Sequence, residues 1–261
     1  MANFHMEIGN ITRWRRKSIA KCLNYISGQK VRDNYLGQTF YRKREDVLMT
    51  RVFLPTNAPP EFSDMQRLCD EINNSEKRYD ARTGRVLICS LPNELPQTEW
   101  ERIVSEFVEE CFSSHGICAV TAIHDGKNVK DPLRNNPHVH IIITTRTADE
   151  HGFSKVKHRE LDKRKYIWVW RKEWEDIINR TYERNKCRER VSCHSYEVQG
   201  IRDFEPTIHL SRIDWEKEKR GERTLEGDIK RDIKEKNKKR RAKEEEKMRK
   251  RERDRYRTIS R

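Results

Sequence analysis

The stretch that decides the fold reads Asn136-Pro137-His138-Val139-His140-Ile141-Ile142-Ile143. Its apolar run predicts a β-strand, and His138 and His140 then point to the same face because side chains alternate along a strand. A second apolar run, from Ile117 to His124, ends fourteen residues before His138. A polar, turn-rich segment joins the two runs, so His124 would lie near the other two histidines if the strands pair as neighbours.

Three imidazoles converging from two strands predict a metal site. Imidazole suits zinc, manganese, iron, nickel or copper, and three protein ligands leave coordination positions open, as catalytic sites require. The alternative is that each histidine is a surface or hydrogen-bonded residue, and the third histidine favours the metal site over it. Histidine-triad hydrolases have a third histidine in the same strand, and Ile142 occupies that position here, which excludes that class.

The rest of the chain predicts strands alternating with helices. The periodicity indicates an α+β fold, an antiparallel β-sheet with helices packed on one face. In the helix over 165–185 the apolar face includes Trp168 and Trp174, whereas Trp170 falls off it. The other expected strands are 3–11, 47–54 and 85–91, and the other expected helices are 18–27, from about Pro60 to Lys77, 98–115 and 225–257.

The positive charge is concentrated at the C-terminal end. The chain has a net charge of +14, of which Trp215 to Arg261 supplies +9. We therefore expect a globular domain over 1–214 and a highly charged helical or partly disordered tail over 215–261. This balance favours a polyanionic partner, and the long charged helix would bind DNA non-specifically or remain solvated.

The sequence lacks the features of several classes of protein. No run of eighteen apolar residues exists, so no membrane insertion is expected, and the N-terminus lacks the layout of a signal peptide. The seven cysteines are scattered without a Cys-x-x-Cys pair, which indicates reduced cysteines rather than disulfides or a zinc finger. We therefore expect a cytoplasmic protein.

Tyr25 lies at the end of the helix over 18–27, in a cation-rich part of the chain. A tyrosine hydroxyl is a weak nucleophile at its free pKa of about 10, and a metal or cationic field would activate it. Residue pattern alone favours simple packing for Tyr25, and Tyr35 and Tyr41 are equal candidates. The run Arg13, Trp14, Arg15, Arg16 and Lys17 suits phosphate and stacking contacts with single-stranded DNA, or a solvated surface.

Ordered motifs over most of residues 3–225 give the chain a family likeness. The sequence resembles the MobA/MobL family of plasmid mobilisation relaxases, members of the HUH endonuclease superfamily. The motifs are Phe4-His5, Ser18 with Asn24-Tyr25-Ile26-Ser27-Gly28, Tyr41-Arg42 to Val47, Ala58-Pro59, Glu76-Lys77-Arg78, Leu91-Pro92-Asn93-Glu94-Leu95, Ala122-Ile123-His124-Asp125, Asn136-Pro137-His138-Val139-His140, His194-Ser195-Tyr196, Gln199-Gly200 and Glu205-Pro206-Thr207-Ile208-His209-Leu210.

The resemblance implies a site and a reaction. Tyr25 would attack a DNA phosphate at an origin of transfer, forming a 5′-phosphotyrosine link that can later be rejoined. His124, His138 and His140 would hold Mg²⁺ or Mn²⁺, and Glu76 or Asp125 would fix the histidine tautomers. Partners would be single-stranded or supercoiled origin DNA, accessory mobilisation proteins and a conjugative coupling protein in a bacterial cytoplasm.

Two alternatives share parts of this pattern. A replication-initiator or transposon-type HUH nuclease would use the same chemistry, but its tyrosine follows the histidine motif, whereas Tyr25 precedes it here. A non-catalytic DNA-binding mobilisation accessory protein would need neither Tyr25 nor the histidines.

Overall fold

A computed structural model describes residues 4–15, 17–127, 135–208 and 210–259 of the 261-residue chain. The chain divides into two compact units, Met1–Cys193 and His194–Arg261. That 1–214 acts as one domain, with the tail beginning at residue 215, stays a prediction. Within the described residues, no helix combines the length and apolar character that a membrane span needs.

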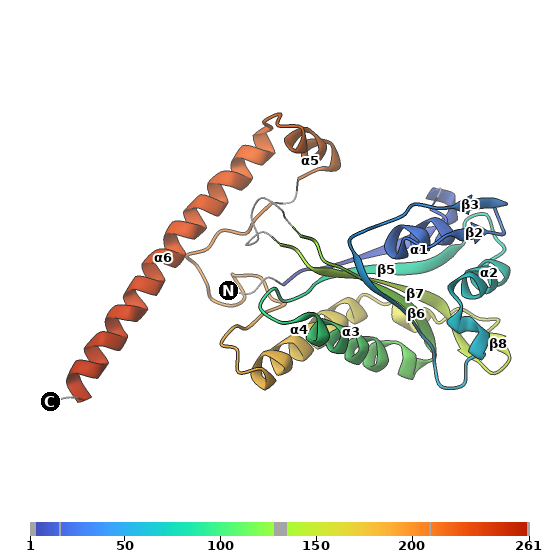
Figure 1. The fold of residues 1–261 in the computed structure, drawn as a ribbon, viewed down its shortest axis with the longest axis horizontal. Coiled ribbons are helices and arrows are strands. Elements are labelled where there is room, and N and C mark those ends of the chain that lie inside the picture. The colour runs from blue at the N-terminus through green and yellow to red at the C-terminus, as the bar shows by residue number, and fades with distance from the viewer. Residues whose placement is uncertain (1–3, 16, 128–134, 209, 260–261) are drawn as a thin grey trace. The chain divides into compact units, whose positions relative to one another are not determined.

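An antiparallel sheet forms the centre of the first unit (Figure 1). The longest strand, β7, lies in the middle, and β8 pairs with its far end. The α+β class and the antiparallel sheet are thereby confirmed. In spatial order the strands are β1 (Met6–Thr12), β5 (Arg82–Ser90), β7 (His138–Asp149), β6 (Ile117–His124) and β4 (Val47–Phe53), with β8 (Gly152–Phe153) beside β7.

Helices cover both faces of this sheet, not the single face expected from the sequence. Helices α1 (Ile19–Ser27) and α2 (Met65–Ser75) lie on one face, and α3 (Gln97–Cys111) and α4 (Lys165–Arg184) on the other (Figure 1). The reason is that all eight residues of β6 are buried. A strand that is apolar at odd and even positions needs a covering layer on each side.

Specific residues cap the ends of these helices. The Ser18 side chain accepts a hydrogen bond from the backbone N–H of Lys21 at the start of α1, and Gly28 ends the helix with φ 69°. A left-handed residue after a helix favours glycine, because it has no Cβ to clash. Gly116 does the same, with φ 78°, after α3 and the short 3₁₀ helix η3 (Ser113–His115).

Other elements differ from the expectation. The helix expected from about Pro60 begins only at Met65, as α2. Pro59 and Pro60 instead begin a separate 3₁₀ turn, η2 (Pro60–Ser63). In α4 it is Trp170 and Trp174 that are buried, whereas Trp168 is exposed. The short hairpin of β2 (Val31–Asp33) and β3 (Gln38–Phe40) and the 3₁₀ turns η1 (Arg13–Arg15) and η5 (Arg159–Asp162) were not predicted.

The second unit contains α5 (Arg212–Lys219) and α6 (Leu225–Ile259). The predicted long charged helix is therefore confirmed. Phe204 and Ile233 are among the buried residues of this unit. The side chain of Asn237 makes two hydrogen bonds with the backbone of Glu205.

Candidate metal centre and nucleophile

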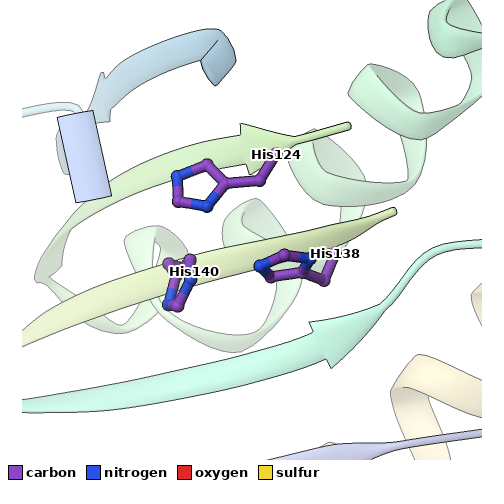
Figure 2. Close-up of side chains that lie close together, drawn as sticks. All are labelled: His124, His138 and His140. Carbon is purple, nitrogen blue, oxygen red and sulfur yellow. The ribbon is translucent and has the colours of Figure 1, made fainter. Parts of the chain in front are cut away.

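The register of β6 and β7 brings the three histidines together. His124 lies opposite His138, and Ala122 lies opposite His140. These positions face the α1 and α2 side, together with the buried Val120 and Ala122. Figure 2 shows the three rings gathered on the two adjacent strands. One ligand atom from each ring lies within 4.8 Å of the others, so one ion is within reach of all three.

Burial keeps the His124 and His140 imidazoles neutral. His124 and His140 are buried and His138 is half-buried. Burial lowers the pKa of His124, and burial together with the neighbouring histidines lowers the pKa of His140 to about 3. A neutral imidazole is the form that binds a metal, so His124 and His140 would release few protons when an ion binds.

Backbone carbonyls fix the tautomers of two of the histidines. His124 donates from Nε2 to the carbonyl of Ile26 at 2.7 Å, and His138 donates from Nδ1 to the carbonyl of Asn136 at 2.7 Å. Each ring therefore keeps a lone pair on its other nitrogen. His124 Nδ1 is buried and has no hydrogen-bond partner among the described residues. A buried acceptor without a partner is what a bound cation would satisfy, so the donor set fits a divalent metal.

His140 predicts how the stability of the metal-free protein depends on pH. Its folded pKa of about 3 lies below the usual value of about 6.5, so the unfolded chain takes up a proton that the folded chain does not. Stability is therefore full above pH 6.5 and falls as the pH drops toward 3. Between pH 6.5 and 5 the free energy of unfolding should fall by up to about 2 kcal/mol through this group.

Urea unfolding in EDTA at the two pH values measures this loss. The same pair of measurements on His140→Gln gives the contribution of all other groups. An equal pH dependence in the two proteins would contradict the assignment.

Tyr25 lies beside the histidines, on the last turn of α1. Its ring meets the ring of His140 edge-on, with the centroids 5.9 Å apart, and the side chain is 47% exposed. The turn is held from two sides, because His124 bonds the carbonyl of Ile26 and Arg44 donates to the carbonyl of Tyr25 at 3.0 Å. Carbonyls at a helix C-terminus have no partner within the helix, so these two bonds satisfy them.

Arg44 and Asp46 belong to the site, although sequence reasoning gave them no role. Arg44 donates to Asp46 from both Nε and Nη2, and its guanidinium lies 4.8 Å from the centroid of the Tyr25 ring. This pairing lowers the pKa of Asp46 to about 2, so the carboxylate is charged. Asp46 lies 3.9 Å from His124 Nδ1 and places negative charge beside the candidate metal site. The only available signal was their position inside the motif from Tyr41 to Val47.

Comparison with known proteins bears on this arrangement. The model of the MobA/MobL family matches residues 17–220 of the chain, which includes α1, both histidine strands and the start of the second unit. The chain belongs to the MobA/MobL family.

Individual relatives and a solved structure agree with the family. The chain is 32% identical over 162 residues to a probable mobilization protein MobA of Bifidobacterium longum, covering 61% of this chain and 28% of that protein. It is 26% identical over 241 residues to a conjugal transfer protein TraA of Agrobacterium fabrum, covering 80% and 21%. It thus spans about a quarter of the length of these relatives.

The fold is also that of a solved structure described as the molecular basis of vancomycin resistance transfer in Staphylococcus aureus. The two superpose with a TM-score of 0.66 at 24% identity, over 74% of this chain and 99% of the other.

Replacing Arg44 tests what holds Tyr25 in place beside the histidines. Arg44→Gln removes the paired hydrogen bonds to Asp46 and the bond to the Tyr25 carbonyl, so Tyr25 loses one of its two anchors. A displacement of about 1 Å of a reacting group can cost on the order of a hundredfold in rate. If Tyr25 attacks DNA, as the family resemblance implies, nicking of a single-stranded substrate by this variant should be about tenfold to a hundredfold slower.

The matched control is Arg42→Gln, which changes an exposed arginine two residues away. Equal rates for the two variants would show that Arg44 does not position Tyr25.

The structure does not bring Glu76 to the histidines. Its buried carboxylate accepts from Thr145 and Arg146 and pairs with Lys157 at 2.9 Å. Thr145 lies five residues beyond His140 on β7, which is roughly 17 Å along a strand. Asp125 follows His124 directly, and its carboxylate pairs with Lys127 at 3.2 Å. His124 and His138 instead donate hydrogen bonds to backbone carbonyls.

Glu76 should therefore matter for stability and not for metal binding. Glu76→Gln leaves the charges of Arg146 and Lys157 without their buried partner, and breaking such a pair costs about 3–5 kcal/mol. We expect urea unfolding to show that loss, whereas calorimetric Mn²⁺ affinity stays within about twofold. Glu61→Gln, at an exposed position, is the control for stability. A large loss of Mn²⁺ affinity in the folded Glu76 variant would restore its predicted role at the metal.

The predicted DNA-contacting run is only partly described. Arg13 donates to the side chain of Asn73 at 2.8 Å and lies over the ring of Tyr35, so much of its hydrogen-bonding capacity is occupied. Trp14 and Lys17 are exposed. Arg16 and the side chain of Arg15 lie outside the described part of the chain. A role of this run in DNA binding stays a prediction.

Proposed function

We propose that this chain is the nicking part of a DNA relaxase. It cuts one strand at an origin of transfer through Tyr25, holds the cut end as a 5′-phosphotyrosine, and rejoins it for mobilisation of a plasmid or integrated element. The observation that carries this proposal is the placement of Tyr25 on the last turn of α1, with its ring 5.9 Å from that of His140.

Membership of the family supports the proposal, as do relatives that are called mobilization and conjugal transfer proteins. A nuclease also needs an exposed nucleophile, and Tyr25 is 47% exposed whereas the imidazoles of His124 and His140 behind it are buried. A DNA strand can therefore reach the hydroxyl from solvent while the histidines face it from the sheet.

The reaction balances without an external oxidant or energy source. The Tyr25 oxygen forms a bond to phosphorus, its proton passes to solvent, and the bond from phosphorus to the 3′ oxygen breaks. That oxygen leaves as a 3′ hydroxyl after taking a proton. The phosphotyrosine ester is still a phosphodiester, so the 3′ hydroxyl can attack it and reverse both steps.

His124, His138 and His140 are the residues that would hold the cofactor, which we propose to be Mg²⁺ or Mn²⁺. A divalent cation bound there would act as a Lewis acid on a phosphate oxygen. The chain's own part is to keep the three imidazoles oriented. The Ile26 and Asn136 carbonyls do this for His124 and His138, and Asp46 adds negative charge.

Partners follow from the same proposal. The substrate would be single-stranded or supercoiled DNA at an origin of transfer, contacted in part by Arg13, Trp14 and Lys17. Accessory mobilisation proteins and a conjugative coupling protein would act with it. The basic helix α6 suits non-specific contact with DNA phosphates, whose affinity falls steeply with salt.

The experiment uses the full chain and fluorescently labelled oligonucleotides tiled across both strands of the DNA beside its coding region. With Mn²⁺, one oligonucleotide should yield a shorter fragment and a protein band that stays shifted on a denaturing gel. EDTA should abolish both. Cleavage without a protein-linked fragment, or an adduct that forms equally well in EDTA, would refute the mechanism. A nick mapped to a replication origin would favour the replication-initiator class instead.

A further inference from the structure

A cavity of about 340 Å³ opens at the start of α1, outside the histidine cluster. It lies where α1, the β2–β3 hairpin and α2 come together. Its volume is within the range of pockets that take small ligands, which is about 300–1,000 Å³. The residues that line it include Lys17, Ser18, Lys21, Asp33, Tyr35 and Tyr79.

Buried polar groups build part of its lining. Asp33, which is 2% exposed, accepts hydrogen bonds from Ser18 and from the side chain of Asn73. It also accepts from the backbone N–H groups of Tyr35 and Leu36. The carboxylate is thus fully engaged, and the network holds the hairpin against both helices. A polar lining fixed in this way is preorganised for a ligand.

Aromatic rings form the walls. Tyr35 is 45% exposed, with the guanidinium of Arg13 3.7 Å from its ring centroid, and Tyr79 is 74% exposed. Exposed tyrosines beside a polar hollow offer flat apolar surfaces for stacking. Every nucleobase has such a face, and stacking on aromatic side chains is how proteins hold unpaired bases.

Two cations complete the cavity. Lys17 and Lys21 are exposed and line the cavity, and neither has an ion pair among the described residues. Both therefore remain available for the phosphates on either side of a bound nucleoside.

The cavity is close to the nucleophile. Ser18 lines it, and Tyr25 lies seven residues further on, about 10 Å along the axis of α1. At about 3.4 Å per nucleotide, this distance corresponds to roughly three nucleotides of a stacked strand, and to fewer in a stretched one.

We propose that this cavity binds one unpaired nucleotide of the DNA strand, within about three nucleotides of the phosphate that Tyr25 attacks. The base lies against the Tyr35 and Tyr79 rings, and its flanking phosphates contact Lys17 and Lys21. A base in a duplex is paired and cannot enter, so the cavity selects a single strand. This inference rests on the proposed function for its distance to the cut, but the binding itself is testable without cleavage.

The test measures binding of the full chain, in EDTA, to a fluorescein-labelled 30-nucleotide single strand of mixed sequence by anisotropy. Tyr35→Ala should weaken binding about fivefold to a hundredfold, whereas Tyr35→Phe keeps the ring and should bind like the wild type. Trp168→Ala is the matched control, because this exposed tryptophan lies on α4, on the other face of the sheet. Affinity for the duplex of the same sequence should not change in any variant.

Photocrosslinking adds a readout of position. With 5-iodo-deoxyuridine in the single strand, we expect crosslinked peptides that contain Tyr35 or Tyr79. Crosslinks elsewhere only, or equal affinity of Tyr35→Ala and Trp168→Ala, would overturn the inference. If wild type forms the covalent adduct yet Tyr35→Ala binds normally, the inference fails alone. If Tyr35→Ala loses binding but wild type never forms an adduct, the proposed function fails and the nucleotide cavity stands.

Discussion

Tyr25→Phe should abolish covalent attachment of DNA to the chain. The change removes one oxygen atom and leaves the ring that packs beside His140 and Arg44, so the fold and the metal site should persist. Without a hydroxyl there is no oxygen to form the bond to phosphorus. The expected loss is at least about a thousandfold in adduct yield, measured on a denaturing gel with the oligonucleotide that the wild type cuts.

Tyr41→Phe is the matched control, since Tyr41 is 68% exposed and was an equal candidate from residue pattern alone. It should form the adduct at the wild-type rate. An adduct of normal yield in Tyr25→Phe would move the nucleophile to another residue. Mn²⁺ affinity of Tyr25→Phe should stay within about twofold of wild type, which separates a lost nucleophile from a damaged site.

His138→Ala should remove most of the metal affinity. His138 is the least buried of the three histidines, so its loss is the least damaging to the core. Losing even an outer partner of a ligand typically costs tenfold to a hundredfold in metal affinity, and losing a ligand itself should cost at least about a hundredfold. Calorimetric titration with Mn²⁺ measures the change, and divalent-dependent cleavage should fall in parallel.

His151→Ala serves as the control, because His151 lies at an exposed turn between β7 and β8. It should bind Mn²⁺ like the wild type. Unchanged affinity in His138→Ala would show that the three imidazoles do not share an ion.

The centre of the sheet was predictable because its signals are local. The run around His138 and His140 is long, apolar and free of glycine, and the segment from Ile117 to His124 is its equal. Two such strands joined by a turn-rich segment are expected to pair as neighbours, and the convergence of the three histidines followed from that pairing together with the alternation of side chains. Ser18 and Gly28 likewise marked the ends of α1 through local backbone chemistry.

Contacts between distant segments were not predictable from spacing. The partner of His124 is the backbone carbonyl of Ile26, 98 residues away, and a carbonyl carries no sequence signature. Arg44 and Asp46 lie between two elements, and nothing local says that they meet the end of α1. Periodicity also misassigned Trp168 and Trp170, because α4 turns a different stripe toward the sheet than the one counted. The odd positions of β6 needed their own cover, which the single-face expectation ignored.

The hydrogen bond from His124 to the carbonyl of Ile26 couples the proposed metal site to the helix terminus beside it. Whatever steadies the imidazole also steadies the helix terminus that carries the neighbouring Tyr25, and coupling between two equilibria is reciprocal. An ion that orders the histidines should therefore reduce fraying of the last turn of α1. By the same relation, if DNA is held covalently on Tyr25 as we propose, it should raise the affinity of the histidines for the ion, which would keep the ion in place for resealing.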